Sequence, residues 1–299
     1  MTITIEQAVE RITAWRGRQI AVQPLSGGLT NTNYRVEVDG ISYVIRLPGA
    51  ATELLAIDRD NEYHNTRAAG ESGVGPTVAH YLPDVHVMVL DFIAGETMSI
   101  ARLSQPGMPA RIARSLKILH TRAPRFKQDF NMFRLTEYYL KIAAGHSVRI
   151  PEGYPDYLPR VARIEAAFAR RPLPSVPCHN DLLAENYIDD GQALRLIDFE
   201  YSGNNDPTFE LGNTCQEQQY DEARILEMCA AYFGEAQADK LARMKLNMIM
   251  SDVGWTLWAA IQARISTIQF DFWGWAVERW GRATAKMGNP EFERWLAEV

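Results

Sequence analysis

The residue pattern changes character near residue 93, and this change limits the folds open to the chain. Before that point, residues 21–47 hold two runs of alternating apolar and polar residues, interrupted first by a glycine pair and then by Asp39-Gly40. Alternation with a period of two predicts antiparallel strands, and an Asp-Gly step predicts a hairpin turn. Two further strands are predicted at residues 77–82 and 86–93.

The same N-terminal region holds two predicted helices. Thr4 and Gln7 have the spacing of a capping box, which predicts a helix over residues 4–15. Residues 58–69 show a second helical pattern, which we expect to end at Gly70.

Beyond residue 93 the apolar side chains recur every three or four positions, as on one face of a helix. This spacing predicts helices at residues 109–120, 135–144 and 158–169, and a helical, tryptophan-rich region from residue 221 onward. Asp190-Gly191 predicts one more hairpin between these helical regions. We therefore expect an α+β fold of two lobes: a small antiparallel β lobe over residues 1–93 and a larger, mostly helical lobe over residues 94–299.

Composition excludes several classes of partner. Lys and Arg number 31 against 37 Asp and Glu, a net charge of −6, which gives no general attraction to nucleic acid. Three cysteines without a CxxC spacing suggest neither a disulfide framework nor a thiolate metal site. The N-terminal residues lack the apolar core of a signal peptide, and the most apolar stretch, residues 246–265, contains Asp252 and Arg264. We therefore expect a cytoplasmic protein without membrane insertion.

The strongest chemical signal is the segment His179-x-Asp181-x4-Asn186, followed by Asp198 across the predicted hairpin. This is the layout of a catalytic loop for phosphoryl transfer, in which one carboxylate faces the acceptor hydroxyl and the hairpin returns a second. Asp181 is then the candidate base, and Asn186 and Asp198 are candidate Mg²⁺ ligands, because Mg²⁺ prefers oxygen ligands. Taken singly, such residues are also typical of turns and helix caps. Their order on one loop and one hairpin favours catalysis.

The predicted β lobe carries residues suited to ATP. A glycine pair between two strands lets backbone N–H groups approach phosphate oxygens, although such a pair is also an ordinary turn. Arg46 stands where kinases have a phosphate-binding lysine, and Glu62 on the following helix could pair with it, in the active site or as a surface salt bridge. The backbone near residue 92 could bind adenine or could simply connect the lobes. The candidate nucleotide-binding residues are Gly27, Gly28, Thr30, Asn31, Arg46, Glu62, Asp91 and Ile93.

With these residues assembled, the chain resembles the choline/ethanolamine kinase family, within the wider group that includes aminoglycoside phosphotransferases. The resemblance lies in LSGGLTNTNYRV, YVIRLPG, HNDLLAEN, IDFEYSGNNDPTFELGNTCQE and WTLWAAIQARISTIQF. It implies a protein-kinase-like fold and transfer of the γ-phosphate of ATP, with Mg²⁺, to the hydroxyl of choline. Asp181 would be the catalytic aspartate, and Asn186 and Asp198 would hold the metal.

The resemblance also implies a pocket for the acceptor. Glu217 matches an acidic residue of the choline pocket, and an aromatic wall around the ammonium group would be formed by Trp255, Trp258, Phe270 and Trp275. A trimethylammonium has no N–H to donate, so ring faces and a nearby carboxylate suit it. These rings are equally typical of core packing. Gln218 follows Glu217 where the family commonly has tryptophan, and Tyr220 could supply a ring there or only pack.

Other functions remain open at this point. The acceptor could be ethanolamine, thiamine, an aminoglycoside or another small alcohol, although ammonium groups with several N–H donors need more acceptors than an aromatic pocket offers. A choline-binding module without chemistry is the alternative from another class. The sequence indicates no oligomeric state.

Overall fold

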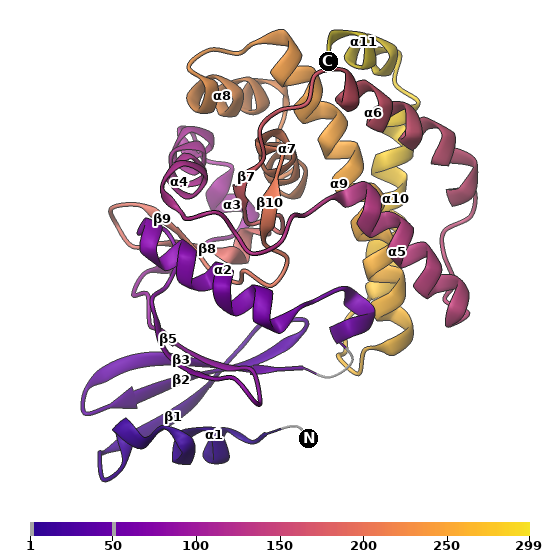
Figure 1. Ribbon diagram of the computed structural model, residues 1–299. Helices are drawn as coiled ribbons and strands as arrows, with labels where there is room; N and C mark the ends of the chain where they lie inside the picture. Colours follow the sequence, from indigo (N-terminus) through magenta and orange to yellow (C-terminus); the bar gives the residue numbers. More distant parts are fainter. Residues whose placement is uncertain (1–2, 50–51) are drawn as a thin grey trace.

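A five-stranded antiparallel sheet forms one end of the molecule, with strand order β1-β2-β3-β5-β4 (Figure 1). The computed structural model describes residues 3–49 and 52–299. The strands are β1 (Ile20–Leu25), β2 (Asn31–Val38), β3 (Ile41–Pro48), β4 (Val78–Leu82) and β5 (Val87–Asp91).

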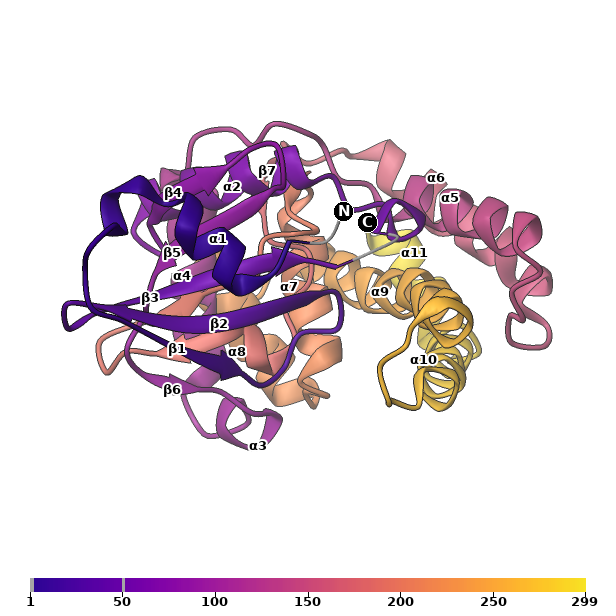
Figure 2. The same cartoon turned by 90° about the horizontal axis from the view of Figure 1, so that it is seen from below.

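The predicted hairpins of this sheet are confirmed. Asp39 and Gly40 both have positive φ, 48° and 83°, as the tight turn between β2 and β3 requires. Helix α1 (Ile5–Arg11) covers the sheet face that points away from the helical lobe (Figures 1 and 2). Its Thr4–Gln7 capping box is present. The helix ends earlier than predicted, because the chain turns extended at Ile12 and resumes as a short 3₁₀ helix, Thr13–Trp15.

Helix α2 (Arg59–Ser72) lies between the sheet and the helical lobe (Figure 1). Our prediction that it ends at Gly70 is wrong: the helix continues to Ser72 and ends at Gly73, whose φ is 85°. Gly70 serves a packing need instead, because a Cβ there would lie 2.7 Å from the Pro76 carbonyl oxygen.

The larger lobe is built around the long helix α9 (Ala238–Ile265), which is buried over most of its length as predicted for residues 246–265. Helices α5, α7, α10 and α11 pack against it. The other helices of this lobe are α3 (Ile100–Leu103), α4 (Met108–Arg122), α5 (Met132–Gly145), α6 (Leu158–Arg170), α7 (Pro207–Glu217), α8 (Glu222–Phe233), α10 (Phe272–Met287) and α11 (Glu291–Glu298). None of the helices that the structure describes is long and apolar enough to span a membrane.

Short strands of the larger lobe flank the loop that carries Asp181. β7 (Val176–Cys178) pairs with β10 (Gly203–Asn205), and β8 (Tyr187–Asp189) pairs with both β6 (Glu96–Thr97) and β9 (Leu194–Leu196). The β8–β9 hairpin turns at Asp190-Gly191, as predicted. A lobe boundary at residue 93 stays a prediction.

Candidate active site

Asp181 lies on the loop that follows strand β7. The preceding residue, Asn180, has a φ of 69°, which is uncommon outside glycine. Its side chain holds this bend, because Nδ2 donates to the backbone oxygens of Tyr201 and Gly203 at 3.1 and 3.3 Å. Asp181 is left half-buried, and among the described residues none donates a hydrogen bond to its carboxylate. This carboxylate is therefore available to a ligand.

Glu210 on α7 holds this loop in place through hydrogen bonds to its backbone. Its carboxylate accepts hydrogen bonds from the backbone N–H groups of His179, at 2.8 Å, and Asn180, at 2.9 Å. It also pairs with His120 Nε2 at 2.6 Å, and both side chains are fully buried. Sequence reasoning missed Glu210, although it lies in the segment FELGN that carries the family resemblance.

Asn186 is anchored in an orientation that suits a metal ligand. Its Nδ2 donates to the Asp181 backbone oxygen at 2.7 Å, which leaves Oδ1 without a partner among the described residues.

Burial, followed by the charges of Asp198 and Glu217, raises the pKa of Asp181 well above its usual value. A positive charge beside this carboxylate would favour its ionised form.

Asp198 returns toward the loop after the β8–β9 hairpin, with a φ of 72°. It forms an ion pair with Arg46 of strand β3, and Arg46 Nε lies 2.8 Å from Glu62 Oε1 of helix α2. Burial is the largest single influence and raises the pKa of Asp198, but its interactions with Arg46, His179 and Arg59 together hold that pKa below its usual value. The Arg46–Glu62 pair is therefore buried beside Asp198, and its interpretation as a surface salt bridge is wrong.

Glu200 connects the glycine-containing turn to this cluster. Its carboxylate accepts from Thr30 Oγ1 at 2.6 Å and Asn31 Nδ2 at 2.7 Å, and it lies 3.3 Å from Arg46 Nη2 and 3.2 Å from Arg59 Nη1. Burial is the largest cause that raises the pKa of Glu200, to about 7. Sequence reasoning did not single out Glu200 or Arg59.

These groups fit Mg²⁺ and a nucleotide. Glu62, Asp198 and Glu200 bring carboxylate oxygens within 4.8 Å of one another, close to the arginine that would meet phosphate. Buried N–H groups of Arg59, at Nε and Nη2, have no hydrogen-bond partner among the described residues. Gly28 has a φ of 90°, and a Cβ there would lie 2.8 Å from the Asn31 backbone oxygen. Carboxylate oxygens suit a metal ion. Guanidinium N–H groups without a partner and a narrow glycine turn suit phosphate oxygens.

The segment predicted to bind adenine leaves one backbone donor available. The Asp91 N–H donates to the Thr77 oxygen at 2.9 Å, and the Phe92 N–H donates to the Ser42 oxygen at 3.3 Å. The Ile93 N–H has no partner within the described part of the chain. A cavity of about 270 Å³ borders this segment, between it and the β8–β9 hairpin.

The predicted aromatic residues lie together. Ring centroids are separated by 6.5 Å between Trp255 and Trp258, by 5.9 Å between Trp258 and Trp275, and by 5.6 Å between Trp275 and Phe270. Trp255 and Trp258 are buried, whereas Phe270 is 48% exposed and forms the outer end of the row. Tyr201, between β9 and β10, contacts this row, with its ring 4.9 Å from Trp255 and its hydroxyl 2.5 Å from Trp258 Nε1.

Glu217 is paired within the protein. Arg279 of α10 donates to both of its oxygens, at 2.6 and 2.8 Å, and the guanidinium lies 4.2 Å from the centre of the Trp275 ring. Gln218 Nε2 donates to the Leu182 oxygen at 3.1 Å. Tyr220 donates to the Leu103 backbone oxygen and packs in a different core cluster from the tryptophans, so its ring is not part of this aromatic row.

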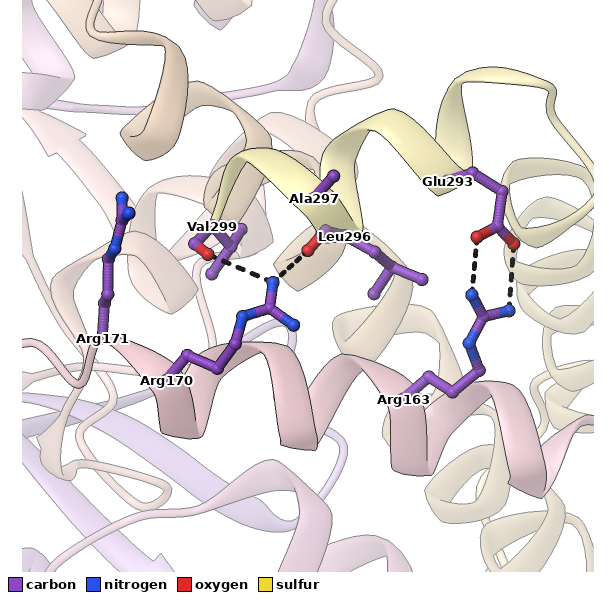
Figure 3. A pocket seen from close by; sticks show the side chains of 7 residues that line it. All are labelled: Arg163, Arg170, Arg171, Glu293, Leu296, Ala297 and Val299. Carbon is purple, nitrogen blue, oxygen red and sulfur yellow. Dashed lines mark hydrogen bonds and ion pairs between the residues drawn. The ribbon is translucent and has the colours of Figure 1, made fainter.

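A second, larger cavity of about 460 Å³ lies between α6 and α11 (Figure 3). Its arginines are largely satisfied: Arg163 binds Glu293 at 2.9 and 2.5 Å, and Arg170 donates to the backbone oxygens of Leu296 and Val299. Arg171 points away from these pairs (Figure 3). None of the predicted site residues lines this cavity, so it does not belong to the active site.

The fold and this constellation define a phosphotransferase with a protein-kinase-like architecture. Aminoglycoside phosphotransferase APH(4)-Ia shares the fold, with a TM-score of 0.65 at 13% identity. The sequence profile of the choline/ethanolamine kinase family matches residues 22–240. The chain belongs to the choline/ethanolamine kinase family, whose members are ATP-dependent kinases of small alcohols.

Some of the similar proteins are named ethanolamine kinases and others choline kinases. Mouse ethanolamine kinase 1 is 28% identical over 313 residues, covering 90% of this chain and 84% of its own. A choline/ethanolamine kinase family protein from Mesorhizobium loti has a TM-score of 0.85 and 36% identity, covering 97% of this chain and 96% of its own. Choline kinase LicA from Streptococcus pneumoniae has a TM-score of 0.78 and 25% identity, covering 94% and 98%. A LicA structure in complex with AMP is also similar, with a TM-score of 0.74.

Proposed function

We propose that this enzyme transfers the γ-phosphate of ATP to the hydroxyl of choline. One observation carries the proposal: Tyr201, three residues after Asp198, contacts both Trp255 and Trp258. The aromatic row therefore contacts the segment between β9 and β10 that also carries the candidate metal ligand Asp198. An acceptor cation held by these rings would have its hydroxyl near Asp181.

Asp181 is the base in this proposal. Its carboxylate accepts the hydrogen bond of the acceptor hydroxyl, orients the oxygen toward phosphate and takes its proton as the new bond forms. Arg46 positions phosphate oxygens, and the Ile93 N–H is the donor offered to adenine. Asn186 and Asp198 would hold Mg²⁺, which when bound offsets charge on the phosphates. Catalysis rests mainly on positioning and electrostatics.

Ethanolamine is the second candidate acceptor, because relatives of the chain are named ethanolamine kinases. Choline is favoured by the aromatic row, since a methylated cation needs ring faces rather than hydrogen-bond acceptors. A choline-binding module without chemistry is disfavoured by membership of a kinase family. The cytoplasmic location stays a prediction.

The test is ADP release by the purified protein with choline, ethanolamine, thiamine and an aminoglycoside. We expect choline to give the highest kcat/KM and thiamine and the aminoglycoside to give none above background. A higher kcat/KM for ethanolamine would transfer the proposal to that acceptor. Turnover of thiamine or the aminoglycoside alone would contradict it.

A further inference from the structure

Arg279, which the sequence analysis did not single out, contacts two residues of the proposed acceptor site, Glu217 and Trp275. It is 1% exposed, binds Glu217 through both terminal nitrogens and lies over the Trp275 ring. The carboxylate and the ring that were expected to attract the substrate cation are thus already in contact with a cation of the protein.

The neighbouring carboxylate is paired in the same way. Asp252 accepts from Arg282 at 2.6 and 3.1 Å and from Gln216 at 2.6 Å, and Arg279 Nη1 lies 3.6 Å from it. The Asp181 carboxylate accepts no hydrogen bond from the described residues, but the acceptor hydroxyl requires it. The proposed pocket therefore has little acceptor capacity left for ammonium N–H groups.

We infer that Arg279 determines the acceptor specificity of this enzyme, by neutralising Glu217 so that methylated ammonium groups are preferred over primary ones. The inference rests on the proposed function. A primary ammonium carries three N–H donors, each of which needs an acceptor when water is removed, whereas a trimethylammonium carries none. Release of Glu217 from Arg279 would supply an ionised acceptor and reverse part of this preference.

The test compares kcat/KM for choline and ethanolamine in Arg279→Met. We expect the choline-to-ethanolamine ratio to fall about tenfold or more, with the KM for ATP nearly unchanged. Arg279→Lys keeps the charge but not the planar fork, so it should raise the KM for choline and largely preserve the ratio. An unchanged choline-to-ethanolamine ratio in Arg279→Met would overturn the inference.

Arg149→Met is the matched control. Arg149 also lies over a tryptophan ring of α10, 4.0 Å from the centre of Trp273, but it pairs with neither Glu217 nor Asp252. We expect its acceptor ratio to equal that of the wild type. A fall as large as that of Arg279→Met would show that loss of any nearby charge suffices, which contradicts a specific role for Arg279.

A second variant and a binding measurement distinguish a change of specificity from a loss of folding and from a failure of the proposed function. If Arg279→Met does not fold, Arg279→Gln, which keeps a donor for Glu217 without the charge, should show the same change of ratio in smaller degree. Calorimetric binding of tetramethylammonium and ethylammonium needs no turnover. If the wild type phosphorylates neither amino alcohol, the proposed function fails, yet preferential tetramethylammonium binding that Arg279→Gln loses would still support the inference. Equal binding of both cations by the wild type would overturn it.

Discussion

The carboxylate of Glu210 lies 2.8 Å from the backbone nitrogen of His179, and both residues are completely buried. This contact ties helix α7 to the loop that carries Asp181. Replacement by alanine would leave His120 and two backbone N–H groups buried without their acceptor. Removal of one partner from a buried pair of this kind costs about 3–5 kcal/mol. We expect Glu210→Ala to lower the free energy of unfolding by that amount, measured with urea, and to reduce kcat.

Glu293→Ala is the control for this variant. Glu293 also pairs with an arginine, Arg163, but both side chains are largely exposed. Exposed pairs contribute little to stability, so we expect an unchanged urea midpoint and unchanged kcat. Equal losses of stability in the two variants would contradict the role given to Glu210.

Substitution of Gly28 tests whether the turn that contains it contacts the nucleotide. Gly27 and Gly28 both have positive φ, 97° and 90°, but only at Gly28 would a Cβ meet a backbone atom, the Asn31 oxygen at 2.8 Å. Gly28→Ala should therefore shift the turn, whereas Gly27→Ala adds local strain without a clash. We expect the KM for ATP to rise by about fivefold or more in Gly28→Ala relative to Gly27→Ala, a difference of ~1 kcal/mol. Identical KM values would argue against close phosphate contact at Gly28.

The raised pKa of Asp181 predicts the acid side of the pH–rate profile. A base acts in its ionised form, so a raised pKa moves the loss of kcat/KM on acidification to higher pH. Because the charge of Glu217 contributes to this shift, Glu217→Gln should move the acid limb to lower pH. The measurement is kcat/KM for choline against pH in both proteins. A limb that moves to higher pH in the variant would contradict this assignment.

Replacement of Arg46 by lysine should weaken the binding of ATP. Its guanidinium reaches Glu62 through Nε and both Asp198 and Glu200 through Nη2, which a single ammonium cannot reproduce. We expect Arg46→Lys to raise the KM for ATP by about tenfold, with a smaller change in the KM for choline. Arg18→Lys, in the same lobe and paired at the surface with Asp39, is the control and should leave both constants unchanged. A larger change for choline than for ATP would place Arg46 on the acceptor side.

The sequence predicted the parts of the site that depend on local chemistry. Asp181 and Asn186 lie on one loop and Asp198 follows the next hairpin, and the Asn, Asp and Gly residues typical of such turns indicate both. Arg46 and Glu62 lie on a strand and on the next helix. The partners that complete the site were missed. Arg279 and Glu217 are 62 residues apart, and Thr30 and Glu200 are 170 apart. Such pairs arise when elements that are distant in the sequence pack together, and no local sequence pattern indicates them.

The glycines show the same limit. Gly73 ends α2 through its positive φ, but Gly70 inside the helix is required by the approach of Pro76 from a later loop. A sequence shows that a glycine is present, not which of its two properties is used.

The central claim is that Asp181 activates the hydroxyl of an amino alcohol for attack on ATP, and phosphate transfer by Asp181→Asn tests it most directly. Phosphocholine formation from choline and labelled ATP should be readily measured with the wild type. The isosteric variant should bind ATP with unchanged affinity and form phosphocholine about a hundredfold more slowly or worse. Wild-type rates of phosphocholine formation by Asp181→Asn would contradict the account.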